Sequence, residues 1–123
     1  MANALVACRH VVAPVQLTRF AASCVLELGT ILAEVFDGQT MPALRYLPTF
    51  WTNDRESEEA LAFVEEKCRG ALFSSRIPRA VAIARSMAEA VSLFEPRFRD
   101  SKGAEAYRAF VQEFLTTTEA AHV

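Results

Sequence analysis

The stretch PVQLTRFAASCVLELGTILAEVF, from Pro14 to Phe36, decides how the rest of the chain is interpreted. Its polar side chains recur every three or four positions, which places them in one narrow stripe of a helix. They are Gln16, Arg19, Ser23, Glu27, Thr30 and Glu34. Nearly all other positions in the stretch are apolar, and a helix with so little polar surface is normally surrounded by others. The pattern predicts a central, buried helix over residues 14–36.

Further amphipathic helices are predicted around this central helix, because apolar residues recur at helical spacing in three later stretches. These stretches are residues 54–69, 77–94 and 102–117. The sequence therefore predicts an all-α fold, with residues 1–123 forming a single-domain bundle of four to five helices. A short N-terminal arm (1–13) and a C-terminal tail (118–123) are expected to flank the bundle.

Composition limits the classes of protein to which this chain can belong. With 123 residues, of which 52% are hydrophobic, it can bury a core without disulfides or metal. The formal net charge of −2 offers nucleic acid no electrostatic attraction. An odd number of cysteines (Cys8, Cys24 and Cys68) is typical of buried free thiols in a reducing, intracellular compartment.

The sequence lacks the common motifs of catalytic, metal-binding and phosphate-binding sites. Its two histidines, His10 and His122, stand near the chain ends, and no metal-binding spacing of histidine or cysteine occurs. Four scattered glycines do not form a phosphate-binding loop. We therefore predict no catalytic, cofactor-binding or metal-binding residue, and a protein that is not an enzyme.

A membrane span is not expected either. The most apolar run, residues 20–36, contains Glu27 and Glu34 and is short for a transmembrane helix. Association with a membrane-bound complex through other subunits stays open.

Aromatic residues gather in the stretch QTMPALRYLPTFWTN, residues 39–53. Aromatic side chains and arginine are enriched at the energetic centres of protein interfaces. Arg45, Tyr46, Phe50 and Trp51 are therefore the candidate partner-binding residues. The alternative is a proline-braced connector whose aromatic rings plug one end of the bundle.

The N-terminal segment has an unusual charge pattern. Between Met1 and Leu26 there is no acidic residue, whereas Arg9 and Arg19 are positive. An acid-poor, basic and amphipathic segment is typical of organelle targeting. A docking arm, or chance combined with a buried apolar terminus, gives the same pattern.

These observations favour a non-enzymatic structural or interaction subunit of a larger multiprotein assembly, whose partners are other protein subunits. An accessory subunit of a mitochondrial complex is the concrete version, and the cytoplasm is the alternative location. A second hypothesis is a stand-alone regulatory module, such as a pathogen protein that captures a host helix in an apolar groove. A small-ligand carrier or enzyme with a cavity near Glu27 or Glu34 is less favoured.

Overall fold

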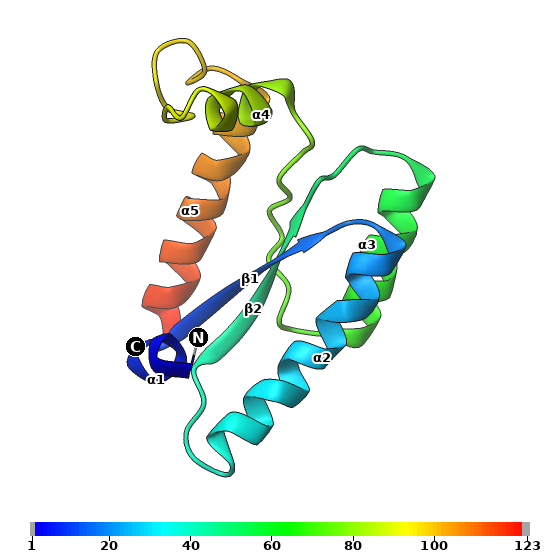
Figure 1. Cartoon of the computed structure of the whole chain (residues 1–123), viewed down its shortest axis with the longest axis vertical. Coiled ribbons are helices and arrows are strands. Elements are labelled where there is room, and N and C mark those ends of the chain that lie inside the picture. The colour runs from blue at the N-terminus through cyan, green and yellow to red at the C-terminus, as the bar shows by residue number, and fades with distance from the viewer. Residues whose placement is uncertain (1, 122–123) are drawn as a thin grey trace.

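The computed structural model describes residues 2–121, except the side chains of residues 2, 3, 25, 26 and 119–121. Within that part of the chain, two parallel strands lie between helices (Figure 1). They are β1, His10–Gln16, and β2, Ala43–Thr49. The prediction of an all-α bundle is therefore wrong, because the fold is mixed α/β. Residues 122 and 123 of the predicted tail lie outside the described residues.

Residues 14–36, which the sequence predicts as one central helix, belong to two different elements in the structure. Pro14–Gln16 completes β1, and the helix α2 runs from Arg19 to Phe36. Thr18 caps α2, because its side chain accepts a hydrogen bond from the backbone N–H of Ala21 at 3.2 Å. Periodicity alone does not distinguish a short apolar strand that precedes a helix from an earlier start of the same helix.

The predicted connector over residues 39–53 contains the central strand of the fold. In β2, Leu44 and Tyr46 pack with the clusters beneath α2, whereas Leu47 packs with the cluster on the opposite face. This alternation is that of a strand covered on both faces. The register places His10 opposite Ala43 and Gln16 opposite Thr49.

A third extended segment, residues 71–79, lies along the other edge of β2. The backbone of Tyr46 accepts a hydrogen bond from Phe73 N–H at 2.9 Å, and Ile77 N–H donates to Pro48 O at 2.9 Å. This pairing consists of two isolated parallel bridges instead of a continuous ladder. β2 is thus the middle one of three parallel segments.

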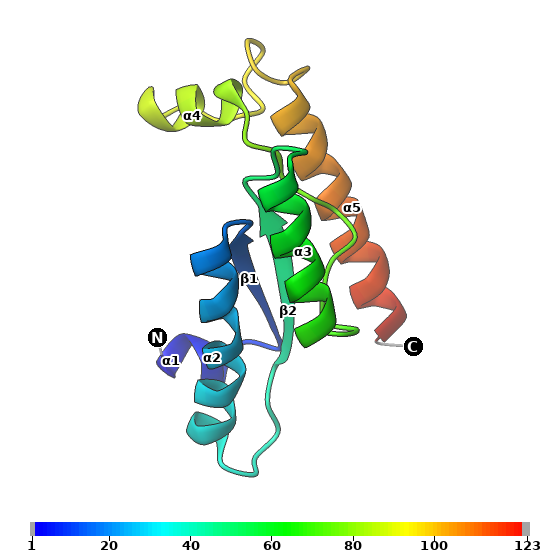
Figure 2. The same cartoon turned by 90° about the vertical axis from the view of Figure 1, so that its right-hand side faces the viewer.

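Helices cover both faces of these segments. The helix α3, Arg55–Lys67, lies beside α2 on one face, and α5, Lys102–Ala121, lies on the other (Figures 1 and 2). Predicted residues 54–69 and 102–117 correspond closely to α3 and α5. Both helices carry local signals: Asp54 accepts from Ser57 N–H at the start of α3, and Ser101 from Ala104 N–H at the start of α5.

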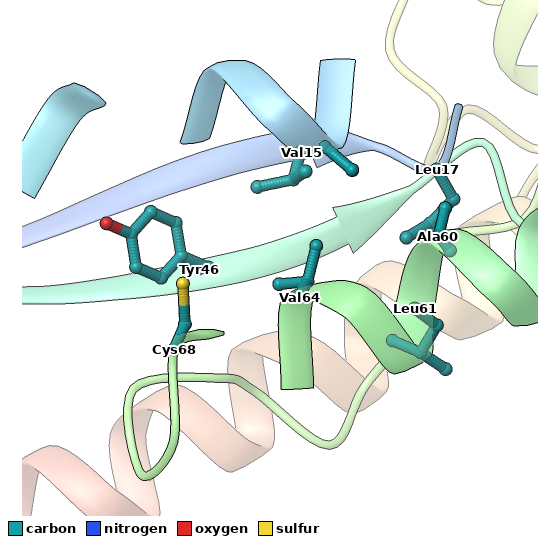
Figure 3. Packing of buried hydrophobic residues seen from close by; sticks show 8 residues of the cluster. Val15, Leu17, Tyr46, Ala60, Leu61, Val64 and Cys68 are labelled. Carbon is teal, nitrogen blue, oxygen red and sulfur yellow. The ribbon is translucent and has the colours of Figure 1, made fainter. Parts of the chain in front are cut away.

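The principal core lies between the strands and the pair α2–α3. Its buried side chains come from both strands and both helices and point toward one another (Figure 3). They are Val15, Leu17, Ala22, Tyr46, Ala60, Leu61, Val64 and Cys68. A second cluster under α5 contains Leu47, Phe73 and Ile77.

The predicted helix over residues 77–94 is much shorter in the structure. The helix α4 runs only from Val81 to Ala88, because residues 71–79 are extended against β2. Ala90 has a left-handed backbone with φ 55°, which ends the helical region. The first helix, α1, Ala2–Ala7, places Leu5 against Leu32 and Phe36 at the far end of α2.

Candidate functional site

The four predicted partner-binding residues do not form one surface. Arg45 and Tyr46 lie on opposite faces of β2, whereas Phe50 and Trp51 follow its carboxyl end. Adjacent residues of a strand point to opposite faces, which separates the first two.

Arg45 is engaged within the molecule. Its guanidinium lies 3.7 Å from the centre of the Phe73 ring, and its Nη1 donates to Thr117 Oγ1 at 2.7 Å. These contacts join β2, the third extended segment and α5. Arg45 therefore holds α5 against the sheet, and its side chain is only partly exposed.

Tyr46 belongs to the core, where its side chain is 5% exposed (Figure 3). Burial raises the pKa of its phenol, and the nearby Cys68 raises it further. Neutral burial among apolar side chains indicates a packing role.

Phe50 and Trp51 begin the loop between β2 and α3. Phe50 is 47% exposed and has a left-handed backbone with φ 59°. The half-buried Trp51 lies under the guanidinium of Arg76, which is 4.6 Å from the ring centre. Trp51 N–H also donates to Ile77 O at 3.1 Å, so Trp51 is fixed to the third segment while Phe50 projects outward.

Hydrogen bonds hold the rest of this loop. The hydroxyl of buried Ser57 lies 2.8 Å from Thr52 Oγ1 and accepts from Thr52 N–H at 3.2 Å. Asp54 accepts from the Thr52 hydroxyl and from Ser57 N–H. The hydrogen bond from Ser57 N–H is the main reason that the pKa of Asp54 lies below its ordinary value. Asn53, between them, is also left-handed with φ 55°.

The carboxyl ends of parallel strands are the usual ligand-binding edge of an α/β sheet. Near this edge a hollow of about 280 Å³ lies between the first turns of α2 and α3, lined by Arg19, Ala22, Ser23, Glu56, Glu59, Ala60 and Phe63. Arg19 faces Glu59 across 3.9 Å, and the Ser23 hydroxyl donates to Phe20 O at 2.7 Å. Arg19, Glu59 and the Ser23 hydroxyl thus each have a local partner, which is not the arrangement of a nucleophile beside its base.

The outer side of α2 carries a surface that sequence reasoning missed. Phe20, Ile31 and Val35 are 81%, 41% and 46% exposed, and Cys24 is exposed between them. We call these four residues the outer stripe of α2. The sequence predicted burial for all of them, including a buried Cys24. Among the described side chains of α2, the buried ones, which include Leu32 and Phe36, lie on one face.

The signal for this surface is present in the sequence. Excess apolar surface on a helix predicts contacts on more than one side. The excess apolar surface of residues 14–36 favours a subunit with partners, whereas the predicted central position implies burial of Phe20, Ile31 and Val35, which are exposed in the structure. Exposed apolar patches are a common feature of interaction surfaces.

Within residues 2–121 no helix is long and apolar enough to cross a membrane. The described histidine, cysteine and acidic side chains form no group of three that would hold a metal ion. Comparison of the chain with protein-family models and with curated proteins finds no match.

Proposed function

We propose that this chain is a non-enzymatic interaction subunit that docks on a protein partner through the outer stripe of α2. The exposure of Phe20, Ile31 and Val35 on one helix is the observation that carries the proposal. Full burial of a side chain of this kind contributes about 1.5–3 kcal/mol relative to exposure. Covering the outer stripe would therefore supply several kilocalories per mole toward association.

The proposal does not require the chain to be located in mitochondria. The acid-poor N-terminal segment includes β1, which forms the sheet with β2, and the first turns of α2. Val15 and Leu17 from this segment are each 2% exposed in the principal core. Packing in the principal core is therefore a sufficient reason for the apolar composition of this segment.

Substitution on α2 tests the proposal. Ile31→Gln places an amide in the centre of the outer stripe, whereas Thr30→Gln places the same side chain on the neighbouring, exposed polar position. A C-terminally tagged chain is extracted gently and its stoichiometric co-eluting protein, including untagged copies, is quantified. We expect Ile31→Gln to abolish co-elution and Thr30→Gln to preserve it.

Thermal unfolding of each purified variant controls for the fold. Because Ile31 is already 41% exposed, we expect only a small loss of stability. Co-elution that is equally insensitive to both variants would reject the outer stripe as the docking surface.

A second candidate, a stand-alone binding module, uses the loop after β2. The supporting observation is the exposed Phe50, which is held outward by a strained left-handed backbone. Under this alternative, Phe50→Ala weakens partner binding while Ile31→Gln leaves it unchanged. The same co-elution measurement thus distinguishes the two surfaces.

A further inference from the structure

We infer that the partner of the outer stripe is a second copy of this chain, with the two α2 helices packed antiparallel about a two-fold axis. This inference rests on the proposed function, because it names the molecule that covers the same surface. It follows from the symmetry of the stripe, from its flanking charges and from the neighbouring strand edge.

The outer stripe is symmetric about the middle of α2. The helix extends from Arg19 to Phe36, so its midpoint falls between residues 27 and 28. Phe20 lies as far before that midpoint as Val35 lies after it, and Cys24 and Ile31 are related in the same way. Antiparallel packing therefore sets Phe20 against Val35 of the second copy, and Cys24 against its Ile31. A two-fold interface requires such self-complementarity.

Charges at the two ends of α2 favour the antiparallel direction. Arg19 begins α2 with a side chain that is 91% exposed, whereas exposed Glu34 and Asp37 lie at the other end. Antiparallel packing brings each Arg19 to the acidic end of the other copy and opposes the two helix dipoles favourably. Parallel packing would instead bring like charges together. The two Glu27 carboxylates lie near the two-fold axis and repel each other, which weakens the dimer without changing its register.

The edge of β1 explains why a helix, and not a strand, makes the contact. Arg9 O and Leu17 N–H both bond to β2, so odd-numbered residues direct their backbone groups to β2 and even-numbered residues direct theirs outward. Pro14 is therefore on the outward side, where it lacks a donor. Proline on an edge strand discourages the addition of another strand.

The size of the contact predicts a reversible dimer. α2 is about 27 Å long at about 1.5 Å per residue, so one helical face buries less than the roughly 800 Å² per partner of a standard interface. The contact extends over a hollow between α2 and the edge of β1, lined by Ala13, Pro14, Val15, Gln16, Ala21, Cys24, Leu28 and Tyr46. We expect dissociation on dilution through the micromolar range.

Disulfide formation tests the register directly. In Ile31→Cys, the antiparallel dimer places the new thiol opposite the native Cys24 of the other copy. Within one chain these two positions are about 10.5 Å apart along the helix, beyond the roughly 7 Å that a disulfide spans. Oxidation of the purified full chain should therefore give a covalent dimer, and peptide mapping should find the link between residues 24 and 31.

Thr30→Cys is the matched control, because Thr30 is exposed on the same helix but lies on its polar stripe. It should form covalent dimers much more slowly than Ile31→Cys at the same concentration. Equal rates for the two variants, or a link only between identical positions, would overturn the antiparallel dimer. If co-elution with a different protein still depends on Ile31, the proposed function stands and the second copy is rejected.

Discussion

Pro48 lies in the middle one of three parallel segments, where proline removes a hydrogen-bond donor from the ladder. The backbone of residue 48 faces the third segment, because its carbonyl accepts from Ile77 N–H. Because Pro48 has no N–H to donate, the pairing of this part of the chain with residues 71–79 consists of two separate bridges. The N–H groups of Ser74 and Ser75, which lie in the gap, donate to the Glu113 carboxylate at 2.7 and 2.9 Å. Glu113 thus joins α5 to the interrupted edge.

This contact makes stability depend on pH. Burial, the largest single influence, raises the pKa of Glu113, but the hydrogen bonds from Ser74 and Ser75 and the charge of Arg45 together outweigh it. The folded-state pKa therefore lies below that of the unfolded chain. Glu113 contributes its stability above the unfolded pKa of about 4.3 and loses it as pH falls through the folded value.

Glu113→Gln should lower the free energy of unfolding at neutral pH by about 1–3 kcal/mol, because charged hydrogen bonds are lost. Urea unfolding of wild type and variant should show this difference shrinking below about pH 4.3. The pKa of Asp54 is also lowered, but Asp54 is present in both proteins, so its effect cancels in the difference between their free energies of unfolding. A difference that is constant at every pH would contradict the role of the carboxylate.

Ala90 has a left-handed backbone with φ 55°, which disfavours a side chain with a Cβ. Ala90→Gly should raise the free energy of unfolding by up to about 1 kcal/mol, after allowance for the greater freedom of the unfolded chain. Ala84→Gly makes the same chemical change within α4 and should lower it by about 0.5–1 kcal/mol. Urea unfolding of both variants measures the two signs, and equal destabilisation would contradict the left-handed assignment.

At the scale of elements, the helices with strong local signals were predictable and the strands were not. α3 and α5 each combine an apolar stripe with a capping side chain, and both lie close to their predicted positions. β1 and β2 are identified by pairing between segments that are distant in the sequence, which no local pattern reports. The sequence pattern places residues 10–13 of β1 in the N-terminal arm and Pro14–Gln16 at the start of a helix, and it places β2 in the connector over residues 39–53.

The candidate site, too, was predictable from the sequence only in part. The aromatic residues after Pro48 predict either a binding loop or a plug, and Phe50 is 47% exposed in the structure. The faces on which Arg45 and Tyr46 lie depend on β2 being a strand. The outer stripe of α2 was visible as apolar sequence. Its exposure was not predictable, because it depends on the three-dimensional arrangement, in which no described element covers Phe20, Ile31 and Val35 fully.

The contact between α4 and α5 depends on a glycine. A Cβ added at Gly103 would lie 2.6 Å from Ile83 Cγ1 and 3.0 Å from its Cδ1. Gly→Ala in a helix normally stabilises by about 0.5–1 kcal/mol. Here Gly103→Ala should destabilise by about 1–3 kcal/mol because it overpacks the contact.

Ile83→Ala removes both atoms that would clash. In that background, Gly103→Ala should be neutral or stabilising, and a double-mutant cycle of unfolding free energies measures the coupling. Stabilisation by Gly103→Ala in both backgrounds would show that α4 does not approach α5 this closely.

For the whole molecule, three parallel segments lie between the pair α2–α3 and α5 (Figure 2). α3 has its apolar stripe directed into the principal core. α2 has apolar side chains both toward that core and on its outer stripe. This two-sided character of α2 connects the fold to the proposed association.

The most direct test is the mass of the purified chain by sedimentation equilibrium over the micromolar range. The chain mass is 13.6 kDa, and we predict a concentration-dependent rise toward twice that value. Ile31→Gln should remain at the monomer mass throughout, while Thr30→Gln should behave as the wild type. A wild-type chain that stays at 13.6 kDa at every concentration would contradict self-association through α2.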